Sequence, residues 1–453
     1  MDTHRETHWL IRRLREQNEA PALVWRGMPW SYASLADAAA ADLVRLTQEG
    51  VSPGTVLAIR GDYSPGVVAL LIAAICNRNI LVPIAASAAA RQDRMLEVAQ
   101  VDRLAAFDEN DRWNLVSCGH DTSHTLLRQL AETGDAGLIL FSSGSTGESK
   151  ASVLSLDQLL DKFRQKRPGF RTLVFLLLDH IGGINTLFHA LCNGGTIIAA
   201  ADRTPNAVAA AIAAHRVQLL PTTPTFLNML LISDAASRHD LSSLEIITYG
   251  TEPMPQTTLA AVAEAMPAVR FKQTYGLSEL GILPTRSRGS NSVWVKFGAA
   301  GFEHKIIDNI LWIRSASAML GYLNALAPFD AEGWFNTQDL VETDGEYMRI
   351  LGRQSELINV GGEKVHPAEI ENVLLQMDNV RDVTVSGRPN PVTGAVVSAR
   401  ITPVHAEEPD AFRRRIRRFC RERLEPFKVP VVIEISDADH HGVRFKKSRS
   451  LAT

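Results

Sequence analysis

Short apolar runs that alternate with helix-like stretches dominate the first 274 residues of the chain. Residues 56–60 and 79–84 are compact apolar runs, and the longer run between them, 66–76, has the length of a buried helix. Further strand-like runs follow at 137–141, 171–178, 196–200, 217–224, 244–249 and 269–274. Because strands that alternate with helices form parallel sheets covered on both faces, the pattern predicts an α/β fold.

The rest of the chain has a different pattern of apolar residues. Short alternating runs at 302–307 and 310–314 predict a small antiparallel layer. After residue 352 comes a compact α+β segment of about a hundred residues, which is enough for a small separate domain. We therefore predict two domains, 1–352 and 353–453.

Composition and charge narrow the class of protein. A formal net charge of -3 gives no reason to expect a nucleic-acid partner. The four cysteines are far apart and form no CxxC pair, so they fit neither a disulfide framework nor a zinc site, and we expect a reduced, cytoplasmic setting. The N-terminus lacks the apolar core of a signal peptide, and the run 66–76 is too short to cross a bilayer, so we expect no membrane span.

The loop from Ser142 to Lys150, Ser-Ser-Gly-Ser-Thr-Gly-Glu-Ser-Lys, follows one of the predicted strands. Glycines let backbone N–H groups approach an anion closely, hydroxyl groups add donors, and the lysine adds a mobile positive charge. These properties suit a polyphosphate. The GxxxxGK[ST] spacing of a Walker A loop is absent, however, and a glycine-serine stretch by itself is usually only a turn.

Further motifs follow this loop in order: Thr-Tyr-Gly-Leu-Ser-Glu at 274–279, Gly-Trp-Phe-Asn-Thr-Gln-Asp at 333–339, the stretch 352–371, and Gly-Val-Arg-Phe-Lys-Lys-Ser-Arg at 442–449. Their order and spacing resemble the adenylate-forming superfamily of acyl-CoA synthetases, peptide-synthetase adenylation domains and beetle luciferases. The resemblance extends from about Trp30 to Leu451. It implies a large N-terminal domain of layered α/β sheets with a small β layer, and a small mobile α+β C-terminal domain.

The resemblance assigns a nucleotide site to these motifs. The loop is implied to hold the β- and γ-phosphates of ATP, Thr274 to touch the α-phosphate, Tyr275 to stack on adenine and Glu279 to hold Mg2+. An aromatic face suits a purine and a carboxylate suits a hard cation, whereas outside this context Tyr275 would be a core aromatic and Glu279 a solvated residue. The implied nucleotide-binding residues are Ser142, Ser143, Gly144, Ser145, Thr146, Gly147, Gly250, Thr251, Glu252, Tyr275, Asp339 and Arg353.

Three positions before the last of these motifs depart from the family pattern. Ser149 stands where proline is usual, Gln338 where glycine is usual, and Ser355 at the hinge, where aspartate or lysine is usual. Asp339 is implied to bind both ribose hydroxyls, a role that suits two acceptor oxygens, and Arg353 to contact the ribose. Ser355 still suits a hinge, because a small polar residue absorbs a φ/ψ change. Serine in place of proline at 149 would leave the phosphate loop more mobile.

The last motif carries the family's terminal catalytic lysine. The family has a basic residue three positions after this lysine, so Arg449 selects Lys446. Phe445 stands where glycine is expected, which leaves Lys447 as an alternative. A lysine pair in a C-terminal tail is otherwise usually a solvated feature. Two adjacent histidines, 440 and 441, rarely face one ion, so we expect no metal site there.

The resemblance also implies an acid-binding pocket near His180, which precedes Gly182 and Gly183 much as in acid–thiol ligases of the family. Amino-acid-activating members carry an acidic partner for the α-ammonium group after this point, and residues 181–186 contain none. Asp179 points the other way if the strand alternates. An aryl or medium-chain acyl acid is therefore favoured. The implied pocket residues are His180, Ile181, Phe226, Tyr249, Gly250, Gly276, Gly281 and Ile282.

The implied reaction has two steps. A small carboxylic acid attacks the α-phosphate of ATP to give acyl-AMP and pyrophosphate, and a thiol of CoA or of a carrier-protein phosphopantetheine then takes the acyl group. The residues implied in catalysis are Lys446, Thr274, Glu279 and Lys150, with ATP and Mg2+ as cofactors. Alternatives are transfer to a non-thiol nucleophile and a non-catalytic ATP-binding relative. An arginine-rich amphipathic stretch at 412–424 is either a solvated helix or a dock for an acidic carrier protein or the CoA phosphates.

Overall fold

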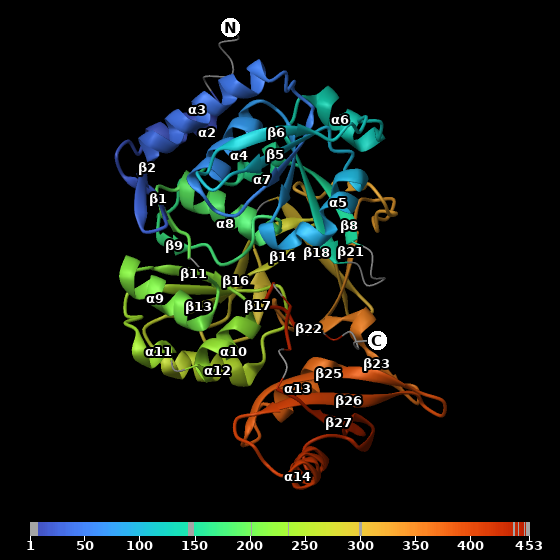
Figure 1. Ribbon diagram of the computed structural model, residues 1–453. Helices are drawn as coiled ribbons and strands as arrows, with labels where there is room; N and C mark the ends of the chain where they lie inside the picture. Colours follow the sequence, from blue (N-terminus) through green and yellow to red (C-terminus); the bar gives the residue numbers. More distant parts are fainter. Residues whose placement is uncertain are drawn as a thin grey trace.

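The computed structural model describes residues 8–143, 149–200, 202–233, 235–298, 301–437, 440–442, 444–447 and 449. They form a large unit, up to residue 353, and a small unit, which has its own sheet and core between residues 358 and 435. The small unit lies at the bottom of Figure 1, in orange and red.

The large unit is built on two seven-stranded sheets. The first has the order β13-β12-β11-β9-β10-β1-β2 and is parallel except for the edge strand β2. Its strands are β1 (Pro21–Trp25), β2 (Met28–Ser31), β9 (Arg171–Leu173), β10 (Thr196–Ile198), β11 (Leu219–Thr222), β12 (Ile246–Tyr249) and β13 (Arg270–Gln273). The second has the order β20-β8-β7-β4-β3-β5-β6 and is parallel from β7 to β5. Its strands are β3 (Val56–Arg60), β4 (Ile80–Ile84), β5 (Arg103–Phe107), β6 (Trp113–Ser117), β7 (Gly137–Ser143), β8 (Ser149–Ser155) and β20 (Gly321–Tyr322).

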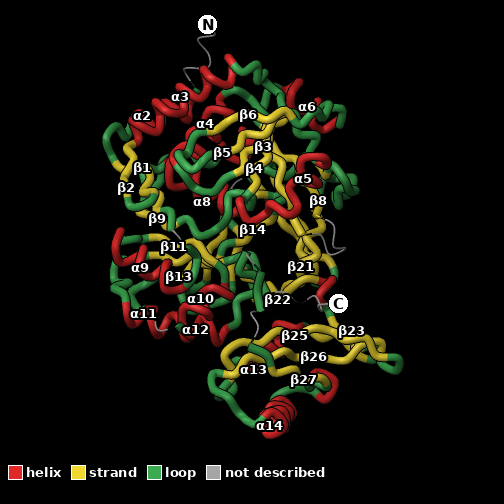
Figure 2. Tube along the Cα trace, viewed as in Figure 1, coloured by secondary structure: helices red, strands yellow, loops and turns green. Residues whose placement is uncertain are grey.

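Helices cover the sheets in layers (Figure 2), as the alternating pattern predicted. Helix α4 is apolar on every side because it shares one core with residues of both sheets. The outer face of the first sheet packs against α9, α10 and α12, and that of the second against α5 and α6. The helices of the large unit are α2 (Trp9–Arg15), α3 (Tyr32–Gln48), α4 (Pro65–Cys76), α5 (Gln92–Val98), α6 (Thr125–Thr133), α7 (Leu156–Asp161), α8 (Ile181–Cys192), α9 (Pro205–His215), α10 (Pro224–Ile232), α11 (Ala235–Arg238) and α12 (Gln256–Ala265).

The predicted antiparallel layer is confirmed. It is a six-stranded sheet of order β16-β17-β22-β21-β19-β18, and a separate hairpin, β14-β15, precedes it in the chain. The strands are β14 (Tyr275–Leu277), β15 (Gly281–Leu283), β16 (Thr285–Ser287), β17 (Val295–Phe297), β18 (Phe302–Ile307), β19 (Ile310–Ser315), β21 (Phe335–Asp344) and β22 (Tyr347–Arg353).

The small unit joins five strands to two helices. Its elements are β23 (Ile358–Val360), β24 (Glu363–Val365), α13 (Pro367–Leu374), β25 (Val380–Asn390), β26 (Gly394–Pro403), α14 (Pro409–Arg421) and β27 (Val432–Ile435). Phe412, Ile416 and Cys420 of α14 are fully buried in its core. The predicted fold class, layered α/β sheets followed by a smaller α+β part, is confirmed.

One predicted boundary is wrong in a way that matters for the site. The run 171–178 was expected to be a single strand, but β9 ends at Leu173 and α8 begins at Ile181. Gly183 allows the loop between β9 and α8 to pack closely, because a Cβ at this position would lie 1.9 Å from the carbonyl oxygen of Leu177. The loop before α8 therefore folds back against the first turn of the helix.

Candidate active site

Three residues implied to hold adenine and ribose meet beside the antiparallel layer. Asp339 on β21 pairs with Arg353 on β22, and Tyr275 comes from β14. The Tyr275 hydroxyl donates to Asp339 Oδ2 at 2.5 Å, and Arg353 Nε lies 3.4 Å from Asp339 Oδ1. We call these three residues the ribose corner.

Burial and mutual charge set the protonation of the ribose corner. Burial, and then the neighbouring Asp339 carboxylate, raise the pKa of Tyr275 well above its ordinary value, so its hydroxyl stays a donor. Burial raises the pKa of Asp339, and Arg353 opposes that rise. Only 7% of Tyr275 is exposed, and its ring packs edge-on against Phe297 with centroids 5.4 Å apart. The stacking of this ring on adenine stays a prediction.

Gln338, at the position where glycine was expected, keeps a glycine-like backbone. Its φ is +59°, in the left-handed region that favours glycine. The turn is stabilised on both sides, because Asn336 Oδ1 accepts from the Gln338 N–H at 2.9 Å and Thr337 Oγ1 accepts from the Asp339 N–H at 3.0 Å. The substitution therefore leaves the direction of Asp339 into the ribose corner intact.

The phosphate end of the predicted site is described only at its edges. Ser142 and Ser143 end β7, whereas Gly144, Ser145, Thr146 and Gly147 lie outside the described residues. At the far end Lys150 Nζ lies 5.3 Å from the centroid of the Tyr322 ring, and the Tyr322 hydroxyl donates to Glu279 Oε1 at 2.7 Å. The structure thus brings Lys150 and Glu279 to the two sides of one tyrosine.

Ser149 is anchored where the loop rejoins the sheet. Its carbonyl oxygen accepts from Asn324 Nδ2 at 2.9 Å, and Asn324 Oδ1 accepts from the Ala151 N–H at 3.0 Å. Asn324 therefore holds the start of β8, although serine replaces the expected proline there.

The carboxyl ends of β12 and β13 meet at Thr274. Its Oγ1 donates to the Tyr249 carbonyl oxygen at 3.1 Å. A Cβ at Gly250 would lie 2.7 Å from both the carbonyl oxygen and Oγ1 of Thr274, so only glycine allows this approach. Thr251 follows with a φ of +76°. This backbone sets the start of the predicted adenine-binding segment.

Glu252, predicted to lie along adenine, is already engaged by backbone groups. Its Oε1 accepts from the Thr225 N–H at 2.8 Å and its Oε2 from the Lys447 N–H at 3.2 Å. It thereby connects the start of α10 to the C-terminal tail. A contact with adenine remains a prediction for this residue.

The two candidate lysines point to different units. Lys447 Nζ donates to the Val383 carbonyl oxygen at 2.6 Å and lies 3.5 Å from Asp382 and 3.7 Å from Glu371, all in the small unit. Lys446 forms no ion pair among the described residues and lines a small cavity of the large unit. The residues around that cavity are Phe175, Leu176, Leu177, His180, Arg203, Thr223, Thr251 and Arg444.

Burial lowers the pKa of Lys446 to about 8, and Glu252 opposes this shift. The charge of Arg353 lowers this pKa further, and the charge of Asp339 raises it. Burial, followed by the charge of Lys446, lowers the pKa of His180 well below its ordinary value. His180 Nδ1 accepts from the Gly182 N–H at 3.2 Å, so the neutral ring carries its proton on Nε2.

The residues implied to line the acid pocket fall into two groups. His180 and Ile181 start α8, which packs against the hairpin where Gly276 pairs with Ile282. At Gly281, the other predicted hairpin residue, φ is +77° and a Cβ would lie 2.9 Å from Leu159. Phe226 and Tyr249 instead belong to the core on the outer face of the first sheet. The Tyr249 hydroxyl is buried with no partner among the described residues.

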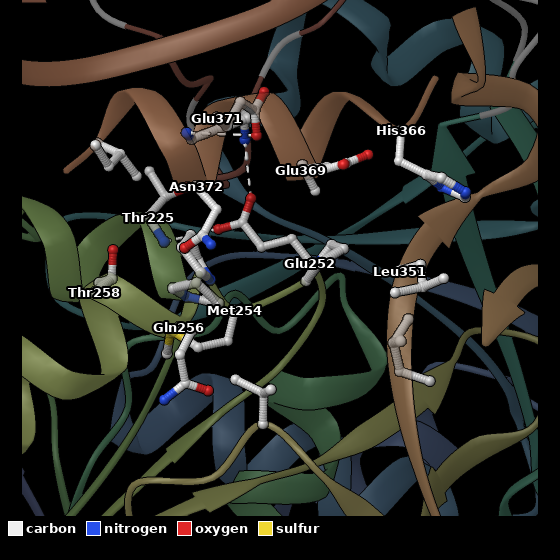
Figure 3. Close-up of a pocket in the computed structure, with 18 of the residues that line it drawn as sticks. Thr225, Glu252, Met254, Gln256, Thr258, Leu351, His366, Glu369, Glu371 and Asn372 are labelled. Atoms are coloured by element: carbon white, nitrogen blue, oxygen red, sulfur yellow. Dashed lines mark hydrogen bonds and ion pairs between the residues drawn. The ribbon is translucent and has the colours of Figure 1, made fainter. Parts of the chain in front are cut away.

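A larger pocket lies between the two units. Its volume is about 280 Å3, and Figure 3 shows Glu369, Glu371 and Asn372 of α13 on one side and Glu252 and Gln256 on the other. Glu252 is the only residue of the predicted nucleotide site that lines it among the described residues. This pocket therefore lies at the interface between the units and not at the predicted nucleotide site.

The structure adds residues that the sequence did not single out. Arg444 pairs with Asp179, and Tyr322 contacts Glu279. Glu371, only 2% exposed, pairs with both Lys447 and Arg449. The spacing of these partners in the chain gives no signal, since each pair joins elements that only folding brings together.

Comparison with known proteins decides the family. The model of the AMP-binding enzyme family matches residues 10–323, and that of the AMP-binding enzyme C-terminal domain matches residues 369–443. The chain belongs to the AMP-binding enzyme family. The predicted adenylate-forming superfamily, and with it the AMP-forming ligase class, is confirmed.

Several curated relatives of the family are CoA ligases. The chain is 27% identical over 485 residues to indoleacetate--CoA ligase of Aromatoleum aromaticum, covering 95% of this chain and 94% of the relative. It is 26% identical to feruloyl-CoA synthase of Amycolatopsis sp, with the same coverage. The match to 4-coumarate--CoA ligase-like 2 of Arabidopsis thaliana is 29% identical but spans only 59% of that protein and 68% of this chain.

Solved structures share the fold over almost the whole chain. An anthranilate CoA ligase in complex with anthranoyl-AMP superposes with a TM-score of 0.81 at 18% identity, covering 97% of this chain and 95% of that one. An amide bond synthetase from Marinactinospora thermotolerans gives 0.76 at 24% identity and covers 95% of each chain. No helix in the described part of this AMP-binding enzyme is both long and apolar enough to cross a membrane.

Proposed function

We propose that this AMP-binding enzyme activates a small carboxylic acid as acyl-AMP, releases pyrophosphate and transfers the acyl group to a thiol. The position of Lys446 carries the proposal. The C-terminal tail delivers this lysine to a cavity lined by residues of the large unit, among them His180 and Thr251, while Lys447 stays with carboxylates of the small unit. A lysine that leaves with the small unit suits a reaction in which only the first step needs it.

The first step places negative charge on the α-phosphate as the acid's carboxylate oxygen attacks it. Lys446 in its protonated form and the Thr274 hydroxyl are the donors proposed to stabilise this charge. The Nε2–H of His180 is proposed to orient the acid's carboxylate. Asp339 and Arg353 hold the ribose, so that attack is in line with the departing pyrophosphate.

Glu279 is the residue proposed to hold Mg2+. The described residues contain no group of three or more His, Cys, Asp or Glu that could bind a metal ion. Mg2+ in nucleotide sites is commonly held by one or two carboxylates and substrate phosphates, so a single glutamate fits. When bound, the ion would compensate the negative charge of the phosphates.

An aryl or medium-chain acid is the proposed substrate. The curated relatives named for indoleacetate, feruloyl and 4-coumarate groups support an aryl acid. Asp179 is engaged by Arg444 and so does not offer a free carboxylate for an α-ammonium group. CoA is the proposed thiol, with a carrier-protein phosphopantetheine as the second acceptor to test.

The hinge between the units is proposed at Ser355. It lies in the short 3-10 turn Gln354–Glu356, directly after β22 ends at Arg353. Ser355→Pro removes one backbone N–H and restricts φ, so we expect it to spare adenylation and to slow thioester formation about tenfold or more. Normal rates in both steps would place the hinge elsewhere.

ATP–pyrophosphate exchange over a panel of aryl, medium-chain and amino acids tests the first step. We expect exchange with aryl or medium-chain acids and none with α-amino acids. The acyl product formed with CoA, with a holo carrier protein and with a simple amine then identifies the acceptor. Absence of exchange with every acid would overturn the proposed activity and favour a non-catalytic relative, and amide formation alone would favour a non-thiol nucleophile.

A further inference from the structure

Arg444, two residues before Lys446, makes an ion pair with the large unit. Arg444 Nη2 donates to Asp179 Oδ2 at 3.1 Å. Asp179 is 4% exposed, and its other oxygen, Oδ1, is buried without a partner among the described residues. Charge-assisted hydrogen bonds to a buried carboxylate are strong, because little water competes for them. Arg444 thus donates a hydrogen bond that compensates this buried charge.

Phe445 adds an apolar anchor next to the ion pair. Its ring centroid lies 5.1 Å from that of Phe175 and 5.8 Å from that of Phe226, and the Arg203 guanidinium lies 5.5 Å from the same ring. Its carbonyl oxygen accepts from Thr223 Oγ1 at 2.8 Å. Its φ is +50°, a conformation that a bulky residue adopts only when its surroundings hold it.

The residues after Lys446 are held by the other unit. Lys447 and Arg449 pair with Glu371, and Arg449 also lies 3.0 Å from Glu356. Lys446 therefore lies between Arg444 and Phe445, which contact the large unit, and Lys447 and Arg449, which pair with Glu371 of the small unit.

We propose that Asp179, Phe175, Phe226 and Thr223 form a seat for Arg444 and Phe445 that positions Lys446 for adenylation and is vacated before acyl transfer. These are positioning residues, since they act through Lys446. The inference rests on the proposed function. Leaving the seat uncovers a buried carboxylate and an apolar slot, and this cost keeps the tail in place until the first step is complete.

Three substitutions test the seat: Asp179→Asn, Arg444→Gln and Phe445→Gly. We expect each to lower the kcat of pyrophosphate exchange about ten- to a hundredfold, because small displacements of a catalytic group have effects of this size. The KM for ATP and the rate of thioester formation from supplied acyl-adenylate should stay within about twofold of wild type. Arg444→Lys should recover part of the loss. Equal loss in both half-reactions, or unchanged exchange, would overturn the proposal.

A readout without catalysis separates the seat from the proposed function. Trypsin cleavage after Arg444, Lys446 and Lys447, followed by mass spectrometry of the full chain, should be faster in Asp179→Asn than in wild type. The matched control is Asp240→Asn, whose carboxylate also lies 3.1 Å from an arginine, Arg216, but is exposed. Equal cleavage in all three proteins would overturn the seat. Faster cleavage without exchange for any acid would keep the seat and overturn only the proposed activity.

Discussion

The ribose corner and the lysine segment, residues 444–447 and 449, are built in different ways. Asp339 and Arg353 are neighbours across one strand pair, and Tyr275 joins them through a single hydrogen bond. Lys446 depends on contacts that join Arg444 to a residue 265 positions away. A site made from paired strands is ready before substrate arrives, whereas a site completed by a distant tail can be dismantled between steps.

The largest expected effect separates the two adjacent lysines. Lys446→Met should lower pyrophosphate exchange about 10²- to 10³-fold, because it removes a positive charge from the developing negative charge. It should leave turnover of supplied acyl-adenylate and the thermal unfolding temperature nearly unchanged. The rates are measured with purified protein in both half-reactions.

Lys447→Met is the matched variant. It leaves the buried Glu371 with one fewer cation, so we expect a loss of about 3 kcal/mol in the free energy of unfolding. Denaturant titration measures this loss. Were Lys447→Met to abolish exchange in a stably folded protein while Lys446→Met remained active, the two roles would have to be reversed.

Asp339→Asn tests the ribose corner, which the strand pairing forms before substrate binds. Removal of a charged acceptor is expected to raise the KM for ATP about ten- to a hundredfold, corresponding to about 1.5–3 kcal/mol of hydrogen bonding. Tyr275→Phe is the control, because it removes only the hydroxyl and keeps the ring. Asp339→Asn should not change tryptic cleavage of the lysine segment. Faster cleavage in this variant would mean that the two regions are coupled.

The pH dependence of pyrophosphate exchange tests the lysine segment. Lys446 has a pKa lowered to about 8, so it is protonated below pH 8 and loses its proton as the pH rises through that value. We expect kcat/KM for exchange, which reports the free enzyme, to fall up to about tenfold per pH unit above 8. The charged and titratable groups that act on this lysine are Glu252, Arg353, Arg444, Asp339 and His180. A flat profile from pH 7 to 10 would contradict this assignment of the proton.

The smallest effect is expected at Gln338. Gln338→Gly and Phe445→Gly both place glycine at a left-handed position, but the Gln338 side chain is exposed. We expect Gln338→Gly to change the free energy of unfolding by less than about 1 kcal/mol and the KM for ATP by less than about twofold. Thermal unfolding and exchange kinetics check both. A loss of exchange kcat as large as that expected for Phe445→Gly would show that the ribose corner also relies on distant contacts.

Motif order and periodicity were enough to predict much of this molecule. The apolar run 66–76 could only be a buried helix, and α4 is one. The family and the fold class followed from motifs whose order was specific. The strand predicted at 171–178 is wrong beyond Leu173. The loop that follows packs Gly183 closely against Leu177, and no local sequence pattern displays such a contact.

The sequence by itself determined the fold class, the family and the residue types available for catalysis, because these depend on local pattern and on short motifs. Only the tertiary structure showed the different surroundings of the two lysines, a cavity lined by large-unit residues for Lys446 and carboxylates of the small unit for Lys447. It alone also brought Arg444 to Asp179 and placed Phe445 between Phe175 and Phe226. These contacts join positions more than two hundred residues apart, and their energies come from burial and charge that exist only in the folded chain.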